Sequence, residues 1–136
     1  MAFLFSNYMV SEITAGIEVI VETTYQEQHS VPEAHEFVFS YKIHIQNHNE
    51  FTVQLLRRRW EIVNAVGELE VIEGEGVVGR QPVLYANESH EYISGCRLLT
   101  AQGRMRGKYY FQNKITGDHF EVNIPEFRLE APFSLN

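Results

Sequence analysis

The sequence has little cysteine and little proline: one Cys and four Pro among 136 residues. The lone thiol, Cys96, excludes an internal disulfide and fits a reducing compartment. No apolar run approaches the roughly 18 residues that a membrane span needs. The first residues also lack the basic start and the unbroken apolar stretch of a secretory signal. We therefore expect a cytoplasmic protein without membrane insertion.

Positive charge is scarce as well, because 11 Lys and Arg stand against 18 Asp and Glu, a net charge of −7. An acidic domain repels the phosphates of nucleic acids, so no nucleic-acid partner is expected. The run RRR at residues 57–59 does not change this. In a strand Arg58 faces away from Arg57 and Arg59, which splits the charge between two faces. We interpret these arginines as salt-bridging and bulge residues beside Trp60.

Helical periodicity is lacking too, whereas alternation of apolar and polar residues recurs along the chain. Residues 17–25 and 37–46 show it most clearly, with Ile17, Val19 and Val21 on one face and Glu18 and Glu22 on the other. We expect one domain over residues 1–136, with its core at about 16–132. About seven short strands separated by turns predict an all-β antiparallel sandwich with immunoglobulin-like or fibronectin type III-like topology.

In one predicted strand the apolar residues change from odd to even positions. Val53 and Leu55 stand at odd positions, whereas Trp60 and Ile62 stand at even ones. A strand cannot bury both pairs in one register, because a shift of one residue exchanges its faces. We therefore predict a bulge or corner between Leu56 and Arg59 that lets the strand change sheets.

The segment VIEGEGVVGRQPV holds a G-x-G-x-x-G pattern at Gly74, Gly76 and Gly79. This pattern binds a dinucleotide when a helix starts behind it and points its N-terminus at the phosphates. Here Pro82 follows and no helical pattern begins, so we expect the glycines to supply positive φ angles in a connecting loop. The alternative is an anion site of glycine amides with Arg80. Three other cations would join it if the fold brought them close: Arg104, Arg106 and Lys108.

Three blocks carry a family resemblance: LLRRRWEIVNAVGELEVIEGEGVVGRQPVL, YISGCRLLTAQGRMRGKYYF and IPEFRLEAP. In this order they resemble the ApaG family, also called CorD, over about residues 16–132. The family usually has SGCPL where this chain has SGCRL, with Arg97 in place of the proline. The resemblance implies a fibronectin type III-like sandwich and a link to bacterial cobalt resistance and magnesium efflux. Related domains in larger eukaryotic proteins, including F-box proteins, imply protein interaction. The family's glycine motif, proposed to bind nucleotide or pyrophosphate, would map onto Gly74, Gly76 and Gly79.

The residues that could bind metal do not show metal-ligand spacing. His44 and His48 are four residues apart on extended chain, about 13 Å, which is too far to share one ion. The acidic residues 68, 70, 73 and 75 offer oxygen ligands, but an alternating hairpin seldom orients carboxylates for Mg²⁺. We expect a solvated acidic face, surface histidines and no metal or other cofactor.

A cysteine nucleophile is the remaining catalytic option. His90 shares the parity of Cys96, but six residues of straight strand span about 20 Å, beyond hydrogen-bond reach. His119 could approach from another strand, and this stays open. Because no acid, base and nucleophile set passes the distance test, we expect no enzyme.

Two functional hypotheses follow. The favoured one is a non-enzymatic interaction module that docks a partner protein on an exposed sheet edge or loop, and such an edge also permits a homodimer. The alternative is a binder of nucleotide or pyrophosphate at Gly74, Gly76, Gly79 and Arg80.

Overall fold

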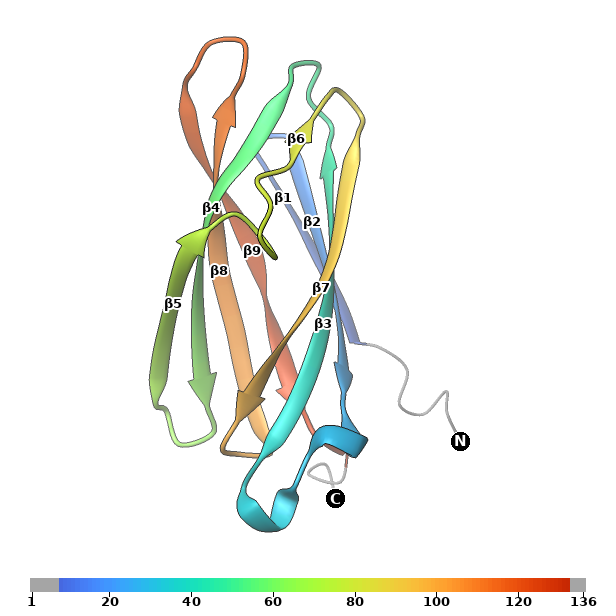
Figure 1. Ribbon diagram of the computed structural model, residues 1–136, viewed down its shortest axis with the longest axis vertical. Coiled ribbons are helices and arrows are strands. Elements are labelled where there is room, and N and C mark those ends of the chain that lie inside the picture. Colours follow the sequence, from blue (N-terminus) through green and yellow to red (C-terminus); the bar gives the residue numbers. More distant parts are fainter. Residues whose placement is uncertain (1–7, 133–136) are drawn as a thin grey trace.

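The computed structural model describes residues 8–132, which form two antiparallel β-sheets packed face to face (Figure 1). The four-stranded sheet has the order β1-β2-β3-β7, with β1 at Tyr8–Thr14, β2 at Ile17–Tyr25, β3 at Phe37–Asn47 and β7 at Ser89–Leu98. The five-stranded sheet has the order β5-β4-β8-β9, and β6 also pairs with β4. Its bounds are β4 Val53–Asn64, β5 Leu69–Glu75, β6 Val83–Leu84, β8 Gln102–Asn113 and β9 His119–Glu130. The predicted sandwich is confirmed.

The strand count is nine, not about seven. The two strands that the sequence did not reveal are β1 and β6. In β1 the large apolar side chains of Met9 and Ile13 point to solvent, 62% and 61% exposed, so no buried apolar face marks the strand. β6 has only two residues. Two short 3₁₀ helices, η2 at Glu27–His29 and η3 at Pro32–Ala34, lie in the predicted loop between β2 and β3. No helix among the described residues is long and apolar enough to cross a membrane.

Alternation decides which side chains enter the core. In β2 and β3 every second residue is buried, including Ile17, Val19 and Val21, as the sequence predicts. Trp60 lies between the sheets with its ring 5.4 Å from that of Tyr41 and 5.8 Å from that of Phe127, centroid to centroid. Aromatic pairs at this separation add to the stabilisation from burial. With apolar side chains filling the interior, chemistry is left to edges, loops and outer faces.

The predicted phase change in β4 is confirmed, but the strand does not change sheets. The ladder with β8 shifts between Leu55 and Arg57, so Leu56 is the extra residue of a β-bulge. Val53 and Leu55 before the bulge, and Trp60 after it, all face the same core. The predicted corner was wrong because a bulge alone exchanges the faces of a strand without moving it to the other sheet.

The predicted short strand HFEVNIP and the extended tail behind it form one strand, β9. The ladder between β8 and β9 shifts between Met105 and Gly107, and on β9 this shift spans Pro125 and Glu126. Pro125 lacks an amide hydrogen, so a bulge is one of the few places in a ladder that tolerates it. Beyond the bulge, Phe127 is again buried, and the tail therefore closes the core.

The two lateral sides of the sandwich differ. On one side β1 lies against β9, where the amide of Asn123 donates to Thr14 Oγ1 at 3.2 Å and its side chain donates to Glu12 Oε2 at 3.1 Å. On the other side the edge strands are β5 and β7, and β5 forms the left border of the molecule in Figure 1. The glycine segment leaves β5 on this second side.

Candidate functional site

The glycine segment is a tight turn tied to the core. Val77 and Arg80 exchange backbone hydrogen bonds of 2.7 and 3.0 Å, and Val78 and Gly79 between them have φ of 47° and 75°. Positive φ at both central positions is the pattern of a type I′ turn. A β-branched residue such as Val78 rarely adopts it. The side chain of Val77 is 1% exposed and anchors the turn in the core.

Gly76 is required because the backbone passes very close to itself. Its φ is 62°, and a Cβ at this position would lie 2.1 Å from the carbonyl oxygen of Arg80. The Gly76 amide donates to Leu56 O at 2.8 Å, and the side chain of Gln81 donates to the same oxygen at 3.0 Å. The β4 bulge thus supplies the acceptor that holds the glycine segment in place.

Some donors of the glycine segment are used within the chain. The amides of Gly76, Val77 and Arg80 donate to backbone oxygens, whereas those of Val78 and Gly79, at the centre of the turn, donate to no acceptor among the described residues. An anion nest needs successive free amides, so only this pair could form one. The guanidinium of Arg58 lies under the segment and donates to the carbonyls of Glu75 and Gly76 at 3.0 and 2.9 Å. Gly76 and Gly79 supply positive φ in the connector as expected, whereas Gly74 lies within β5 without positive φ, and its missing side chain leaves room for the Arg58 guanidinium. Whether the segment binds a ligand stays a prediction.

Arg80 itself is exposed. Burial, and after it the Arg80 charge, lowers the pKa of His90 below its ordinary value, which places the guanidinium near that ring. The fold does not bring the three other predicted cations to this loop. Their side chains lie on the outer face of the five-stranded sheet in ion pairs with glutamates: Arg104 with Glu126, Arg106 with Glu61 and Lys108 with Glu121.

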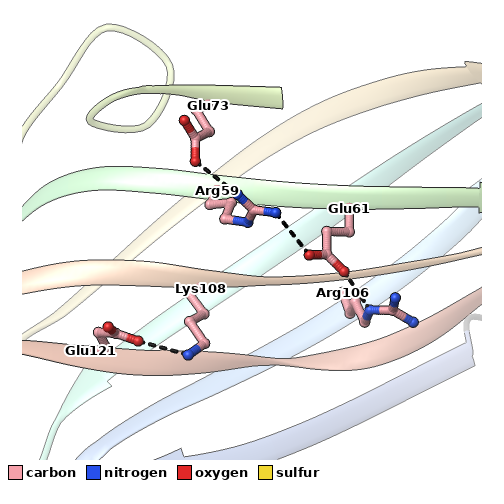
Figure 2. Close-up of polar contacts among 6 residues, drawn as sticks. All are labelled: Arg59, Glu61, Glu73, Arg106, Lys108 and Glu121. Carbon is pink, nitrogen blue, oxygen red and sulfur yellow. Dashed lines mark hydrogen bonds and ion pairs between the residues drawn. The ribbon is translucent and has the colours of Figure 1, made fainter. Parts of the chain in front are cut away.

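The outer face of the five-stranded sheet carries a chain of ion pairs across neighbouring strands (Figure 2). Arg59 on β4 donates to Glu73 on β5 at 3.0 Å and to Glu61 at 3.1 Å, and Glu61 accepts from Arg106 on β8 at 2.7 Å. Hydrogen bonds from Arg106, and then from Arg59, lower the pKa of Glu61. A shallow hollow of about 320 Å³ lies over these side chains. Because acids and bases neutralise each other here, the face has no excess of one charge to select a ligand.

The three arginines of the RRR run divide as expected. Arg58 points inward, Arg59 joins the outer ion pairs, and the Arg57 guanidinium lies 5.6 Å from the ring centroid of Tyr110. Cation–π packing of this kind stabilises a surface without forming a binding patch.

Cys96 lies half-buried on β7. Burial, followed by the charge of Glu70, raises the pKa of its thiol to about 12. A nucleophilic cysteine needs a lowered pKa, because only the thiolate reacts. His119, the other predicted base, is exposed at the start of β9 in the opposite sheet. The thiol therefore stays protonated at neutral pH.

The two histidines with helix-like spacing point to different neighbours of β3. His44 Nδ1 lies 3.3 Å from Glu91 Oε2 on β7, and His48 Nε2 lies 2.9 Å from Glu18 Oε1 on β2. Among residues 8–132 no group of three or more His, Cys, Asp or Glu side chains could hold a metal ion. The cobalt and magnesium link implied by the resemblance has no ligand set in this part of the chain.

The most unusual surface is the free edge of β5. All its residues except Gly74 are exposed, although four large apolar side chains gather on this hairpin. They are Val66 at 72%, Leu69 at 55%, Val71 at 44% and Ile72 at 39% exposed. β5 is also the last strand in its sheet within the described range. An exposed, apolar edge strand invites pairing with another chain. The sequence predicted the strand but not its exposure.

The hydrogen-bond register shows which β5 backbone groups face outward. The Gly76 amide donates to Leu56 O at 2.8 Å, and the Asn64 amide donates to Glu68 O at 3.1 Å. Both pairs belong to the same antiparallel register, in which hydrogen-bonded residue pairs alternate with pairs that are not hydrogen-bonded. The even-numbered residues of β5 therefore bond to β4. Leu69, Val71 and Glu73 direct their N–H and C=O groups away from the sheet, whereas the C=O of Glu75 accepts from the Arg58 guanidinium.

Comparison with known proteins identifies the family. The family model for the ApaG domain matches residues 27–113, which include β5 and the glycine segment. The chain belongs to the ApaG family. Protein ApaG of Brucella abortus (strain S19) is 44% identical over 124 residues, covering 91% of this chain and 95% of that protein. Protein ApaG of Brucella anthropi is 46% identical over the same shares of both chains.

Two solved structures share the sandwich fold of this chain. A crystal structure of a Bordetella pertussis protein assigned as ApaA has a TM-score of 0.83 at 38% identity, covering 85% of this chain and 94% of that one. A second X-ray structure has a TM-score of 0.81 at 40% identity, covering 86% and 88%. The resemblance predicted from the sequence is thus confirmed, and with it the ApaG fold. The names of these relatives assign no ligand or partner.

Proposed function

We propose that this ApaG domain is a non-enzymatic docking module, and that a partner protein binds by adding a strand to the free edge of β5. The observation that carries the proposal is the backbone of Val71 and Glu73, whose N–H and C=O groups point outward from a strand exposed on both faces. In strand addition, main-chain hydrogen bonds provide affinity, and alternate side chains provide specificity.

The side chains of β5 support strand addition. Leu69, Val71 and Ile72 offer apolar surface on both faces of the strand, and a partner strand would cover part of it. The ion pair between Glu73 and Arg59 ties the edge to the rest of the sheet. A rigid edge loses less conformational entropy on binding than a mobile loop does.

A single backbone substitution tests the proposal. Val71→Pro removes an outward N–H and leaves the bonds to β4 in place, because the even-numbered residues make those bonds. Val71→Ala is the matched control, since it shortens the same side chain and keeps the N–H. Affinity capture from a lysate of a bacterium with an ApaG protein should recover a reproducible partner with the native chain and Val71→Ala, and lose it with Val71→Pro. A partner set that Val71→Pro leaves unchanged, or no reproducible partner, would refute docking on this edge.

Binding of nucleotide or pyrophosphate at Gly74, Gly76, Gly79 and Arg80 stays the alternative prediction. Docking has more support because the amides of Gly76, Val77 and Arg80 already donate within the chain. ATP or pyrophosphate at about 100 times its dissociation constant would raise the free energy of unfolding by about 2.7 kcal/mol. A rise in melting temperature with pyrophosphate that Arg80→Ala abolishes would favour this alternative over docking.

A further inference from the structure

We infer that the strand added to β5 belongs to a basic partner segment, with lysine or arginine facing the carboxylates of β5 and apolar residues facing Leu69, Val71 and Ile72. This inference rests on the proposed function, because it specifies the chemistry of the segment that docks on the same edge.

The distribution of charge on β5 carries the inference. The face that includes Val71 begins with two apolar residues and ends with Glu73 and Glu75, whereas the opposite face presents Glu70 beside Ile72. All three carboxylates are exposed. A partner strand therefore meets an apolar half and an acidic half, and opposite charges on directly facing positions stabilise a strand pair.

Two of these carboxylates have no ion-pair partner within residues 8–132. Glu73 pairs with Arg59, but no Lys, Arg or His of the described chain lies within ion-pair distance of Glu70 or Glu75. The net charge of −7 adds a long-range attraction for a basic segment. Acidic residues on an edge strand also discourage its pairing with a second copy of itself, which argues against a homodimer on this edge.

A second copy of this chain fits the edge poorly. Antiparallel pairing of two β5 strands centred on Ile72 would set Val71 against Glu73 of the other copy and Leu69 against its Glu75. Each apolar side chain would then cover a carboxylate, and that of Glu75 has no cation among the described residues. Burial of an unpaired charge is unfavourable. Two chains of like charge also repel each other. A partner strand with lysines at these positions avoids both costs, because each carboxylate gains a cation and the charges of the two chains attract.

Three short peptides test the inference directly. Written for antiparallel pairing, they are KTKVVKI, its neutral counterpart QTQVVQI and its acidic counterpart ETEVVEI, each acetylated and amidated. NMR titration of the isotope-labelled full chain gives the dissociation constants, and the shifts of the Val71 and Glu73 amides report the location. We expect the basic peptide to bind about tenfold tighter than the neutral one. Raising the ionic strength from about 0.02 M to about 0.5 M should remove most of that advantage.

Matched double variants separate the edge from the overall charge. Glu70→Gln with Glu75→Gln should weaken binding of the basic peptide about three- to tenfold. Glu27→Gln with Glu33→Gln removes the same charge from exposed positions in η2 and η3 and should change it less than about twofold. Equal weakening by the two double variants would mean that peptide binding depends only on the net charge of the chain, which would overturn the inference.

The outcomes distinguish this inference from the proposed function. If the neutral or acidic peptide binds as tightly as the basic one and Val71→Pro abolishes that binding, the docking edge stands and the basic partner is wrong. If no peptide binds, or Val71→Pro leaves binding intact, the docking edge itself is refuted. The remaining alternative is a second copy of this chain on the edge, and light scattering at rising protein concentration tests for it. A dimer that Val71→Pro dissociates would place a second copy on the edge and overturn the inference.

Discussion

The two outer strands of the five-stranded sheet, β9 and β5, have opposite relations to the core. β9 buries Val122, Ile124, Phe127 and Leu129 and lies against β1, whereas no side chain of β5 is buried. Both strands alternate in sequence, so alternation alone does not separate a strand that closes the core from one that presents an edge. The difference shows that the sandwich is closed on one side and keeps a paired but uncovered strand on the other.

The largest expected effect comes from removing a ring on the closed side. Phe127→Ala deletes a fully buried side chain that packs against Trp60, so the free energy of unfolding should fall by about 3–5 kcal/mol. Ile72→Ala, on the exposed strand, should cost less than about 1 kcal/mol. Urea denaturation of both variants measures the contrast. Equal losses would mean that β5 contributes to the core as much as β9 does.

A smaller effect is expected where the chain leaves β5. Gly76→Ala combines a left-handed backbone with a clash at 2.1 Å, whereas Gly67→Ala, with φ of 87°, meets no atom within 4 Å. The left-handed conformation costs about 1–2 kcal/mol in each variant, and overpacking adds about 1–3 kcal/mol at Gly76 alone. Thermal or urea unfolding should therefore rank Gly76→Ala clearly below Gly67→Ala in stability. If Gly67→Ala is instead the less stable variant, the close approach of Gly76 to the Arg80 carbonyl is contradicted.

Proline substitutions along β5 should alternate in effect. Ile72→Pro removes a bond to β4 and should cost at least about 1 kcal/mol more than Val71→Pro, which removes only an outward N–H. Far-UV circular dichroism during urea unfolding measures the difference. If Val71→Pro unfolds the chain as readily as Ile72→Pro, the assigned register of β5 is wrong.

The smallest effect is a pH dependence from the thiol of Cys96 on β7. Its pKa of about 12 lies above the ordinary value of 9.0, so the folded state keeps its proton while the unfolded state loses it. This contribution to stability is fully present below about pH 9 and is lost as the pH rises toward 12. Between about pH 8 and pH 10 the native chain should lose about 1 kcal/mol more than Cys96→Ala does. Parallel urea titrations test it, and identical pH profiles would contradict a shielded thiol.

How much of the fold the sequence predicts depends on where each strand hides its apolar face. β2 and β3 follow from alternation because one face of each packs on the core. The phase change from Leu55 to Trp60 predicts the bulge, but it does not distinguish a bulge from a corner, since both exchange the faces of a strand. β1 shows no such signal, because Met9 and Ile13 face solvent.

The candidate site is less accessible to sequence reasoning. The glycines of residues 74–79 attract attention because their pattern is known from cofactor sites, and the missing helix argues correctly for a connector. The edge that we propose as the docking surface has an ordinary strand sequence, LEVIEGE. Its exposure results from its last place in the sheet order, and that order depends on contacts between residues far apart in the chain.

Amide hydrogen exchange of the native chain, followed by NMR, tests the free edge most directly. If β5 bonds to β4 through its even-numbered residues alone, the amides of Glu70 and Ile72 should exchange at least about tenfold more slowly than those of Val71 and Glu73. Addition of the basic peptide should then protect Val71 and Glu73. Protection of Val71 and Glu73 in the chain alone, equal to that of Ile72, would contradict the account, because the edge would already be paired.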